Sequence, residues 1–449
     1  AVRNETDGLG IIHDSSRYKP LRLGQNGGFH EKNGDRGKDH REWGERGLRG
    51  YEQAGRPERH FKGENGGFGG PRSMGGVRVM NSDIRNEDII TGTENKVMQT
   101  FRRGQERFAP HFVLLCCAPS ASMINSDLEY AAEKISGLSG LPAAEVKIAG
   151  ERDYLYGIGM TLEAIGKLLL TAQKTIPGTI NILGANTIDW GKETLLSAER
   201  LFTDAGWQVI SRWGVRETTE NLKRAAAARV NVAVSEAGLR LARYMESEFG
   251  IPYVAGAPFG EEAAKDLLGG ALSAYQAQDG SGKTESGKAK FGGTEAGNAE
   301  SCRAVSSGGN CLKSEVPESE REKAVSPEQI AEAPEILIAA EQFIANAVRQ
   351  TLFFHGLRSI RVLSFYDMDR ACMLQGDKKL ACEDDFAAEA NAASVRMIIA
   401  DPDYQPLVKK EAAYIGFPNG GSFSPVSPTE NFDMTGERLD RWLREKGCF

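Results

Sequence analysis

The sequence predicts an α/β protein made of three Rossmann-like domains, each with a parallel sheet. Short, continuous apolar runs alternate with amphipathic helical patterns along most of the chain. This alternation is typical of parallel strands covered by helices on both faces. A length of 449 residues is enough for two or three domains. Two polar stretches, residues 26–76 and 279–326, interrupt the alternating pattern.

The interruptions give the expected domain boundaries. Residues 1–79 are atypical and rich in Gly, Arg and Glu, and we expect them to be largely disordered because they hold little apolar surface to bury. A first α/β domain is expected over 80–150 and a second over 151–278. The Gly/Ser/Lys/Glu-rich residues 279–326 are typical of a low-complexity linker. The third α/β domain is expected over 327–449.

Each element follows from its local pattern. In the first domain, "HFVLLCCA" and "AEVKIAG" predict strands over 111–118 and 144–150, separated by a helix over 126–138. In the second, helices over 159–174, 192–206, 218–229, 236–250 and 261–276 alternate with strands over 179–185, 207–214, 230–235 and 251–258. In the third, a strand over 335–340 and a helix over 341–356 precede strands over 358–366, 395–401 and 412–418. Gly206 ends one helix as a C-cap, and threonines open the helix that follows.

Ligands of such folds bind at the carboxyl ends of the strands, in crevices between units. This rule places candidate site positions at Cys116 and Cys117, 184–186, 257–260, 340–341 and Asp401.

The composition excludes several classes of protein. A net charge of −7 argues against nucleic acid as the main partner. No apolar run approaches the roughly 20 residues of a membrane-spanning helix. Seven irregularly spaced cysteines do not form the pattern of a secreted disulfide framework, so we expect a reducing cytoplasm.

The adjacent cysteines of "CCAPSASMINSDLEYAAEKI" are the candidate metal ligands. Thiolates bind iron–sulfur clusters, commonly four per cluster, so a single pair would need ligands from a partner subunit. Neighbouring residues of a strand point to opposite faces, and therefore at most one of the two aims easily at a crevice. Cys117 is favoured over Cys116 because it is nearer the strand end. The alternative is that both are ordinary buried core cysteines.

Gly157 and Gly159, in "YGIGM", have two interpretations. They resemble part of a phosphate-binding turn, but the preceding strand and the third glycine of that fingerprint are absent. A tight turn that opens a helix at Thr161 is the other interpretation. Asp401 follows a strand in "ADP", where the proline fixes the turn, and is a candidate polar group at a strand's carboxyl end.

The order of several segments resembles the nitrogenase component 1-like oxidoreductases, a family that includes nitrogenase molybdenum–iron protein subunits, cofactor-assembly scaffolds and dark-operative protochlorophyllide reductase subunits. The matching segments are "NEDIITGTENKV" (86–97), "CAPSASMINSDLE" (117–129), "YGIGMTLEAIGKLL" (156–169), "TINILGANTIDWGKETLLSAERLFTDAGWQV", "TTENLKRAAAARVNVAVSEAGLRLARYMESEFGIPY", "EILIAAEQFIANAVRQTL", "GDKKLACEDD" and "IIADPDYQPLV". They cover most of 80–278 and 333–418.

This resemblance implies function as well as fold. It implies a cofactor that is an iron–sulfur cluster or a larger metallocluster, shared with a homologous component 1-type partner subunit in a homo- or hetero-oligomer. It also implies reduction of a small molecule with electrons from an ATP-dependent iron protein. By the same resemblance, Gly157 and Gly159 approach the cluster between domains.

The chain departs from the family pattern at several positions. No cysteine precedes Cys116, and Ser120 lies nearest the place of the family's cysteine, which makes it a candidate cofactor contact. Ser126 replaces the first acidic residue of the following turn, and Asn419 replaces a histidine in the last one. The departures leave open an alternative function as a non-catalytic cofactor-assembly scaffold or cofactor-binding partner subunit.

Overall fold

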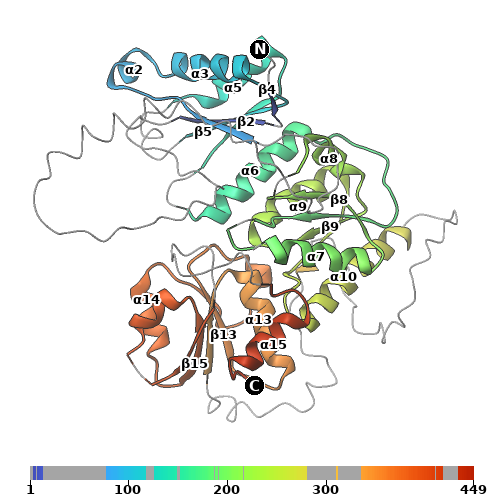
Figure 1. The fold of residues 1–449 in the computed structure, drawn as a ribbon, viewed down its shortest axis with the longest axis vertical. Coiled ribbons are helices and arrows are strands. Elements are labelled where there is room, and N and C mark those ends of the chain that lie inside the picture. The colour runs from blue at the N-terminus through green and yellow to red at the C-terminus, as the bar shows by residue number, and fades with distance from the viewer. Residues whose placement is uncertain are drawn as a thin grey trace, which may run out of the picture. The chain divides into compact units, whose positions relative to one another are not determined.

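The computed structural model describes residues 4–6, 8–13, 77–117, 126–148, 152–186, 188–190, 192–215, 217–280, 310–311, 335–409, 411–417 and 433–449. These residues form three parallel sheets of four or five strands and one separate pair of strands, with helices packed on the sheets (Figure 1). The α/β fold class predicted from the sequence is confirmed. The expected disorder of 26–76 and nearly all of the expected linker over 279–326 fall outside the described residues.

The first sheet has the strand order β3-β2-β5-β6, and its neighbouring strands are parallel. Its strands are β2 (Gly8–His13), β3 (Val77–Asn81), β5 (Val113–Cys117) and β6 (Ala143–Val146), and the pair beside it is β1 (Asn4–Thr6) with β4 (Phe108–Pro110). Its helices are α2 (Asn86–Thr91), α3 (Glu94–Arg107) and α5 (Leu128–Ser139). The sequence predicted no strand at β2 or β3, and yet β2 lies in the middle of the sheet.

Alternation along β5 sends its side chains into two cores. Leu114 packs into the main core of the protein, where Cys116 lies against it. Val113 and Leu115 pack with α3 and α5 in a separate cluster, and Cys117 lies against that one. Figure 1 shows α3 and α5 on one side of β2 and β5. The two cysteines therefore face opposite sides of the sheet, as their adjacency predicts.

The second sheet has the order β11-β10-β9-β7-β8. Its strands are β7 (Thr179–Leu183), β8 (Gln208–Trp213), β9 (Val230–Ala233), β10 (Tyr253–Ala255) and β11 (Asn310–Cys311), the last within the expected linker. Its helices are α6 (Tyr154–Leu169), α7 (Lys192–Asp204), α8 (Thr219–Arg224), α9 (Glu236–Phe249) and α10 (Glu261–Gly280), and a short 3-10 helix, η1 (Ala225–Ala227), follows α8. All five residues of β7 are buried, polar Thr179 and Asn181 included, as expected for a strand covered on both faces.

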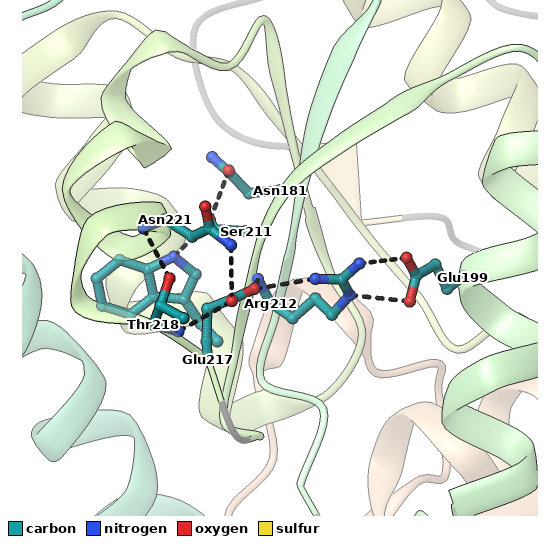
Figure 2. A network of polar contacts seen from close by, with 8 residues as sticks. Asn181, Glu199, Ser211, Arg212, Glu217, Thr218 and Asn221 are labelled. Atoms are coloured by element: carbon teal, nitrogen blue, oxygen red, sulfur yellow. Dashed lines mark hydrogen bonds and ion pairs between the residues drawn. The ribbon is translucent and has the colours of Figure 1, made fainter. Parts of the chain in front are cut away.

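A buried polar network joins β7 to its two neighbouring strands, β8 and β9 (Figure 2). The Asn181 side chain on β7 donates to the Ala225 carbonyl at 2.9 Å and to Asn231 Oδ1 on β9 at 2.8 Å. Its oxygen accepts from the Ser211 hydroxyl on β8 at 2.7 Å, and Ser211 Oγ accepts from Trp213 Nε1 at 2.9 Å. An unpaired buried polar group raises the free energy of the folded state. This network therefore favours the observed strand register over registers shifted by one or two residues, which would break its hydrogen bonds.

Arg212, which follows Ser211 on β8, points to the other side of the strand (Figure 2). Its guanidinium donates to Glu199 on α7 at 2.8 Å and to Glu217 at 3.0 Å. The other oxygen of Glu217 accepts from the Thr218 N–H and the Asn221 amide, both at 2.9 Å. Arg212 thus connects α7 to the start of α8.

Helices α6 and α9 pack closely through glycines. A Cβ on Gly159 would lie 3.2 Å from the Ala237 carbonyl oxygen, and one on Gly166 would lie 2.5 Å from Leu241 Cδ1. The tight turn expected before Thr161 is wrong, because α6 begins at Tyr154 and holds both Gly157 and Gly159. Asp153 starts the helix early by accepting the Tyr156 N–H at 2.9 Å.

The third sheet has the order β14-β13-β12-β15-β16, all parallel. Its strands are β12 (Glu335–Ala339), β13 (Ile360–Ser364), β14 (Lys378–Lys379), β15 (Val395–Ala400) and β16 (Ala413–Gly416). Figure 1 shows α14 (Glu383–Ala390) on one side of the sheet and α13 (Gln342–Phe354) with α15 (Glu437–Glu445) on the other. Residues of β12 alternate between these two sides, with Ile336 and Ile338 in the main core and Leu337 beside α14.

Two polar contacts hold the third sheet's helices. The buried Arg349 of α13 donates to both carboxylate oxygens of Asp377, at 2.7 and 2.8 Å. On the C-terminal helix α15, Asp440 accepts from the Glu261 N–H of α10 at 2.8 Å and lies 3.1 Å from His355 Nε2. None of the helices in the described ranges has the length and apolar character needed to cross a membrane.

Candidate functional site at the carboxyl ends of the strands

Cys116 and Cys117 end β5, at the carboxyl edge of the first sheet. Both are partly buried, and neither forms a disulfide. Burial, the neighbouring Cys117 and the Glu145 carboxylate raise the pKa of the Cys116 thiol to about 11. A thiolate at Cys116 therefore needs a positive partner such as a metal ion.

A second group of polar side chains lies at the carboxyl ends of β7, β9 and β12. After β7, the buried Asp189 accepts from the Tyr154 hydroxyl at 2.5 Å and from the Asn186 amide at 2.9 Å. Burial raises the pKa of Asp189 and is the largest cause of the raised pKa of the Tyr154 hydroxyl. The ring of Tyr154 also contacts Tyr366 edge to face, with centroids 5.3 Å apart. Residues of α6, the β7–α7 turn and the β13 end therefore meet here.

Glu341 follows β12 and is the most enclosed acid of this group, with 1% of its surface exposed. Its Oε2 accepts from the N–H groups of Phe343 and Ile344 at 2.8 and 2.9 Å, which caps α13. Its Oε1 accepts from the Glu236 N–H, at the start of α9, at 3.2 Å. One carboxyl group thus joins the N-termini of two helices that belong to different sheets. Burial raises the pKa of Glu341 to about 8, and Asp189 contributes.

Glu236 is the third acid of this group and lies at the start of α9. Burial raises its pKa to about 7, the Asp153 and Asp367 carboxylates add to the shift, and Arg240 opposes it. Asp153 Oδ2 accepts from the Asp367 N–H at 2.6 Å, a second contact between the start of α6 and the end of β13. Asp367 in turn pairs with Arg152. The acidic interior is therefore surrounded by ion pairs at its edge.

Asp401, the sequence-predicted polar group after β15, is completely buried. Its side chain accepts from the Asp403 N–H at 2.9 Å and caps the short 3-10 helix η3 (Pro402–Leu407). Its backbone carbonyl accepts from the Tyr414 hydroxyl. This geometry is that of a turn cap, and a cofactor contact at Asp401 stays a prediction.

The other predicted site residues are Gly157, Gly159 and Ser120, and the structure describes the first two. Gly159 packs against α9, which accounts for its lack of a side chain without any ligand. Gly157 has no heavy atom within 4 Å of the place its Cβ would take, so space is open beside it. Ser120 falls outside the described residues. The cofactor roles of these three residues stay predictions.

The structure brings together some of the residues that were predicted as site positions at strand ends. Asn186 and Glu341, both at predicted positions, belong to one buried polar group with Asp189, Glu236 and Tyr154, which the sequence analysis missed. A signal was present, since Asp189 and Glu236 each follow a predicted strand within a few residues. Cys116 and Cys117 lie apart from this group, on the first sheet.

No three His, Cys, Asp or Glu side chains within the described ranges are arranged to hold a metal ion. The described part of this chain therefore contains no complete ligand set, and its cysteine pair offers at most a share of one.

Comparisons with known proteins agree with the fold. A family model described as nitrogenase component 1 type oxidoreductase matches residues 58–284, half of the chain. A light-independent protochlorophyllide reductase subunit from Pyropia yezoensis is 28% identical over 187 residues, which are 38% of this chain and 36% of the relative. The corresponding subunit from Chloroflexus aurantiacus is 25% identical over 183 residues, 40% of this chain and 33% of the relative. The match thus spans about a third of each relative's length.

A solved structure described as "Nitrogenase Cp1 at pH 6.5" superimposes with a TM-score of 0.57 at 12% identity, covering 99% of this chain and 88% of the other. At that identity the likeness shows the fold alone. Together with the matched family model, it leads to one conclusion. The chain belongs to the nitrogenase component 1 type oxidoreductase family.

Proposed function

We propose that this protein is a subunit of a component 1-type oxidoreductase that reduces a small molecule through a metallocluster, with electrons from an ATP-dependent iron protein. The observation that carries the proposal is the cysteine pair at the carboxyl end of β5, in a chain whose family is shown over residues 58–284. The relatives are named as subunits of a reductase, which supports a partner subunit and makes protochlorophyllide the first substrate to test.

The donor set fits a share of an iron–sulfur cluster. Thiolates are the usual ligands of such clusters, and the two cysteines face opposite sides of the sheet, so one of them can reach a given site. Cys117 is the better candidate, because it ends the strand whereas burial raises the pKa of Cys116 to about 11. The other ligands come from a homologous partner subunit or from residues outside the described ranges.

The protein's own contribution is to position a cysteine ligand and to shield the cluster from water. When bound, the cluster supplies one-electron chemistry. The carboxyl end of β5 holds the partly buried thiol of Cys117 against the apolar cluster formed with α3 and α5, on its water-poor side. A drier setting strengthens electrostatic interactions around a bound charge.

The test is anaerobic copurification with a neighbouring component 1-like subunit, followed by iron and acid-labile sulfide analysis. Cys117→Ala is compared with Cys116→Ala and with Cys448→Ala, a buried cysteine near the C-terminus. We expect near-stoichiometric iron in the unaltered protein, and loss of iron in Cys117→Ala with iron retained in Cys448→Ala. Absence of iron with every partner would refute the cluster assignment.

A second candidate function is a scaffold that holds a metallocofactor without turning over substrate. The departures from the family pattern favour it, since no cysteine precedes Cys116 and since Ser120 and Asn419 stand where the family has a cysteine and a histidine. The two functions separate in one assay, in which the iron-loaded complex is mixed with the iron protein, ATP and protochlorophyllide. Reduced product supports the oxidoreductase, and retained iron with no product from any small-molecule acceptor supports the scaffold.

A further inference from the structure

Glu341 joins two sheets with a single carboxyl group. Its two oxygens accept the Phe343 and Ile344 N–H groups of α13 and the Glu236 N–H of α9. Helix α13 packs on the third sheet and α9 on the second. Two more contacts cross the same junction, the Asp367 N–H bond to Asp153 and the edge contact of Tyr154 with Tyr366.

The groups that face Glu341 are themselves acidic or neutral. The Asp189 carboxylate, in the β7–α7 turn, raises the pKa of Glu341, and both acids raise the pKa of the Tyr154 hydroxyl on α6. Glu236 of α9 is influenced by Asp153, Asp367 and Asp369, with Arg240 opposing them. At the rim, Arg152 and Lys379 pair with Asp367, and Arg243 pairs with Asp369. Buried carboxyl groups therefore crowd together while the cations stay at the edge.

We propose that Glu341, Asp189 and Glu236 form a protonation-controlled clasp that holds the second sheet to the third, and that rising pH loosens it. The contact between the carboxyl ends of β7 and β9 and the end of β12 would then loosen and tighten with pH. The proposal is independent of the cluster assignment, because none of its residues lies at the cysteine pair.

The direction follows from linkage. All three acids have raised pKa values in the closed protein, to about 8 for Glu341 and about 7 for Glu236, so closing takes up protons. The contribution of a raised acid is complete below its ordinary pKa and is lost as pH rises through the raised one. The contact between the two sheets is therefore expected to weaken between about pH 5 and about pH 8 and to be weakest above that range.

The test is amide hydrogen exchange of the full chain from about pH 6 to about pH 9, with labelling times scaled to cancel the intrinsic effect of pH. We expect protection at the starts of α9 and α13 to fall with rising pH. Protection in α5, which lies on the first sheet, should stay constant over the same range.

Two isosteric substitutions make the test specific. Asp189→Asn removes one charge that raises the pKa of Glu341 while keeping an oxygen for the Tyr154 hydroxyl. The pKa of Glu341 should fall, so the loss of protection should be smaller and should be complete at a lower pH, by about one pH unit. Asp127→Asn is the matched control, because Asp127 caps α5 at 2.9 Å from the Tyr130 nitrogen and lies on the first sheet. It should leave the pH of the transition unchanged.

Glu341→Gln should reduce protection at both helix starts at every pH, because an amide cannot accept with both ends. It should also make the change of protection with pH smaller, because one of the three acids no longer titrates. If that variant does not fold, the Asp189→Asn comparison decides. Protection at the starts of α9 and α13 that is constant with pH in the unaltered protein would overturn the proposal. Equal shifts in Asp189→Asn and Asp127→Asn would also overturn it.

Discussion

Gly238 is a glycine whose replacement should damage the fold directly. It lies in the first turn of α9, where a Cβ would be 2.3 Å from the Leu183 carbonyl oxygen and 2.7 Å from its carbon. Neither neighbour is the end of a flexible side chain. Alanine at this position therefore forces α9 away from the end of β7. The buried acidic side chains described above lie beside that strand end.

The expected cost can be estimated from its parts. Overpacking of a rigid contact costs about 1–3 kcal/mol, and backbone against backbone belongs at the top of that range. The same shift strains the bond in which the Val234 N–H donates to the Leu183 carbonyl at 2.9 Å, worth about 1 kcal/mol. The helical preference of alanine over glycine returns about 1 kcal/mol. The net loss expected for Gly238→Ala is about 3 kcal/mol.

The assay is urea unfolding followed by circular dichroism, with Gly269→Ala as the matched control. Gly269 lies in α10 with no heavy atom within 4 Å of the place its Cβ would take. Alanine there should stabilise the protein by about 0.5–1 kcal/mol through helix propensity alone. The reasoning is refuted if Gly238→Ala costs less than about 1 kcal/mol at an unchanged m-value.

Three further outcomes follow from other parts of the structure. Asn181→Leu should cost about 2–4 kcal/mol by urea unfolding, because it removes three buried hydrogen bonds, whereas a loss within about 0.5 kcal/mol would show that the network is dispensable. Asp377→Ala should cost about 3–5 kcal/mol by the same measurement, because it leaves the buried Arg349 charge uncompensated, and a loss of less than about 1 kcal/mol would contradict the buried pair. Cys116 should resist iodoacetamide near neutral pH and react only as the pH approaches about 11, since about one thiol in a thousand is ionised at pH 8. Mass spectrometry of the alkylated protein checks this, and rapid labelling of Cys116 at pH 8 would contradict the raised pKa.

Strands rich in Ile and Leu were predicted correctly. "TINIL" and "EILIA" became β7 and β12, in the middle of their sheets, where helices cover both faces. β2 was missed because "GLGIIH" holds few apolar residues and its strand character depends on partners from distant parts of the chain, β3 and β5. The C-terminal helix α15 was missed because it is short and charged, although Leu439 and Leu443 have helical spacing and are buried.

In the candidate site too, residues at strand ends were predicted, whereas contacts between distant parts of the chain were not. A rule about strand ends was enough to place Cys116, Cys117 and Glu341, because each directly follows or ends an apolar run. It did not show that Glu341 reaches the N-terminus of α9, a contact between residues 105 positions apart. Pairings of that kind depend on how two sheets pack, and no local pattern encodes them.

The start of α6 is the segment through which the three sheets are joined. Its first residues bond to the third and the second sheet, since Asp153 accepts from the Asp367 N–H at 2.6 Å and Tyr154 donates to Asp189 at 2.5 Å. Farther along, Leu162 shares a core with Val146 of β6 in the first sheet. Contacts of this kind are a physical route by which two sites can influence each other. If the clasp at Glu341 loosens, α6 is therefore the element that would carry the change toward the sheet that holds Cys116 and Cys117.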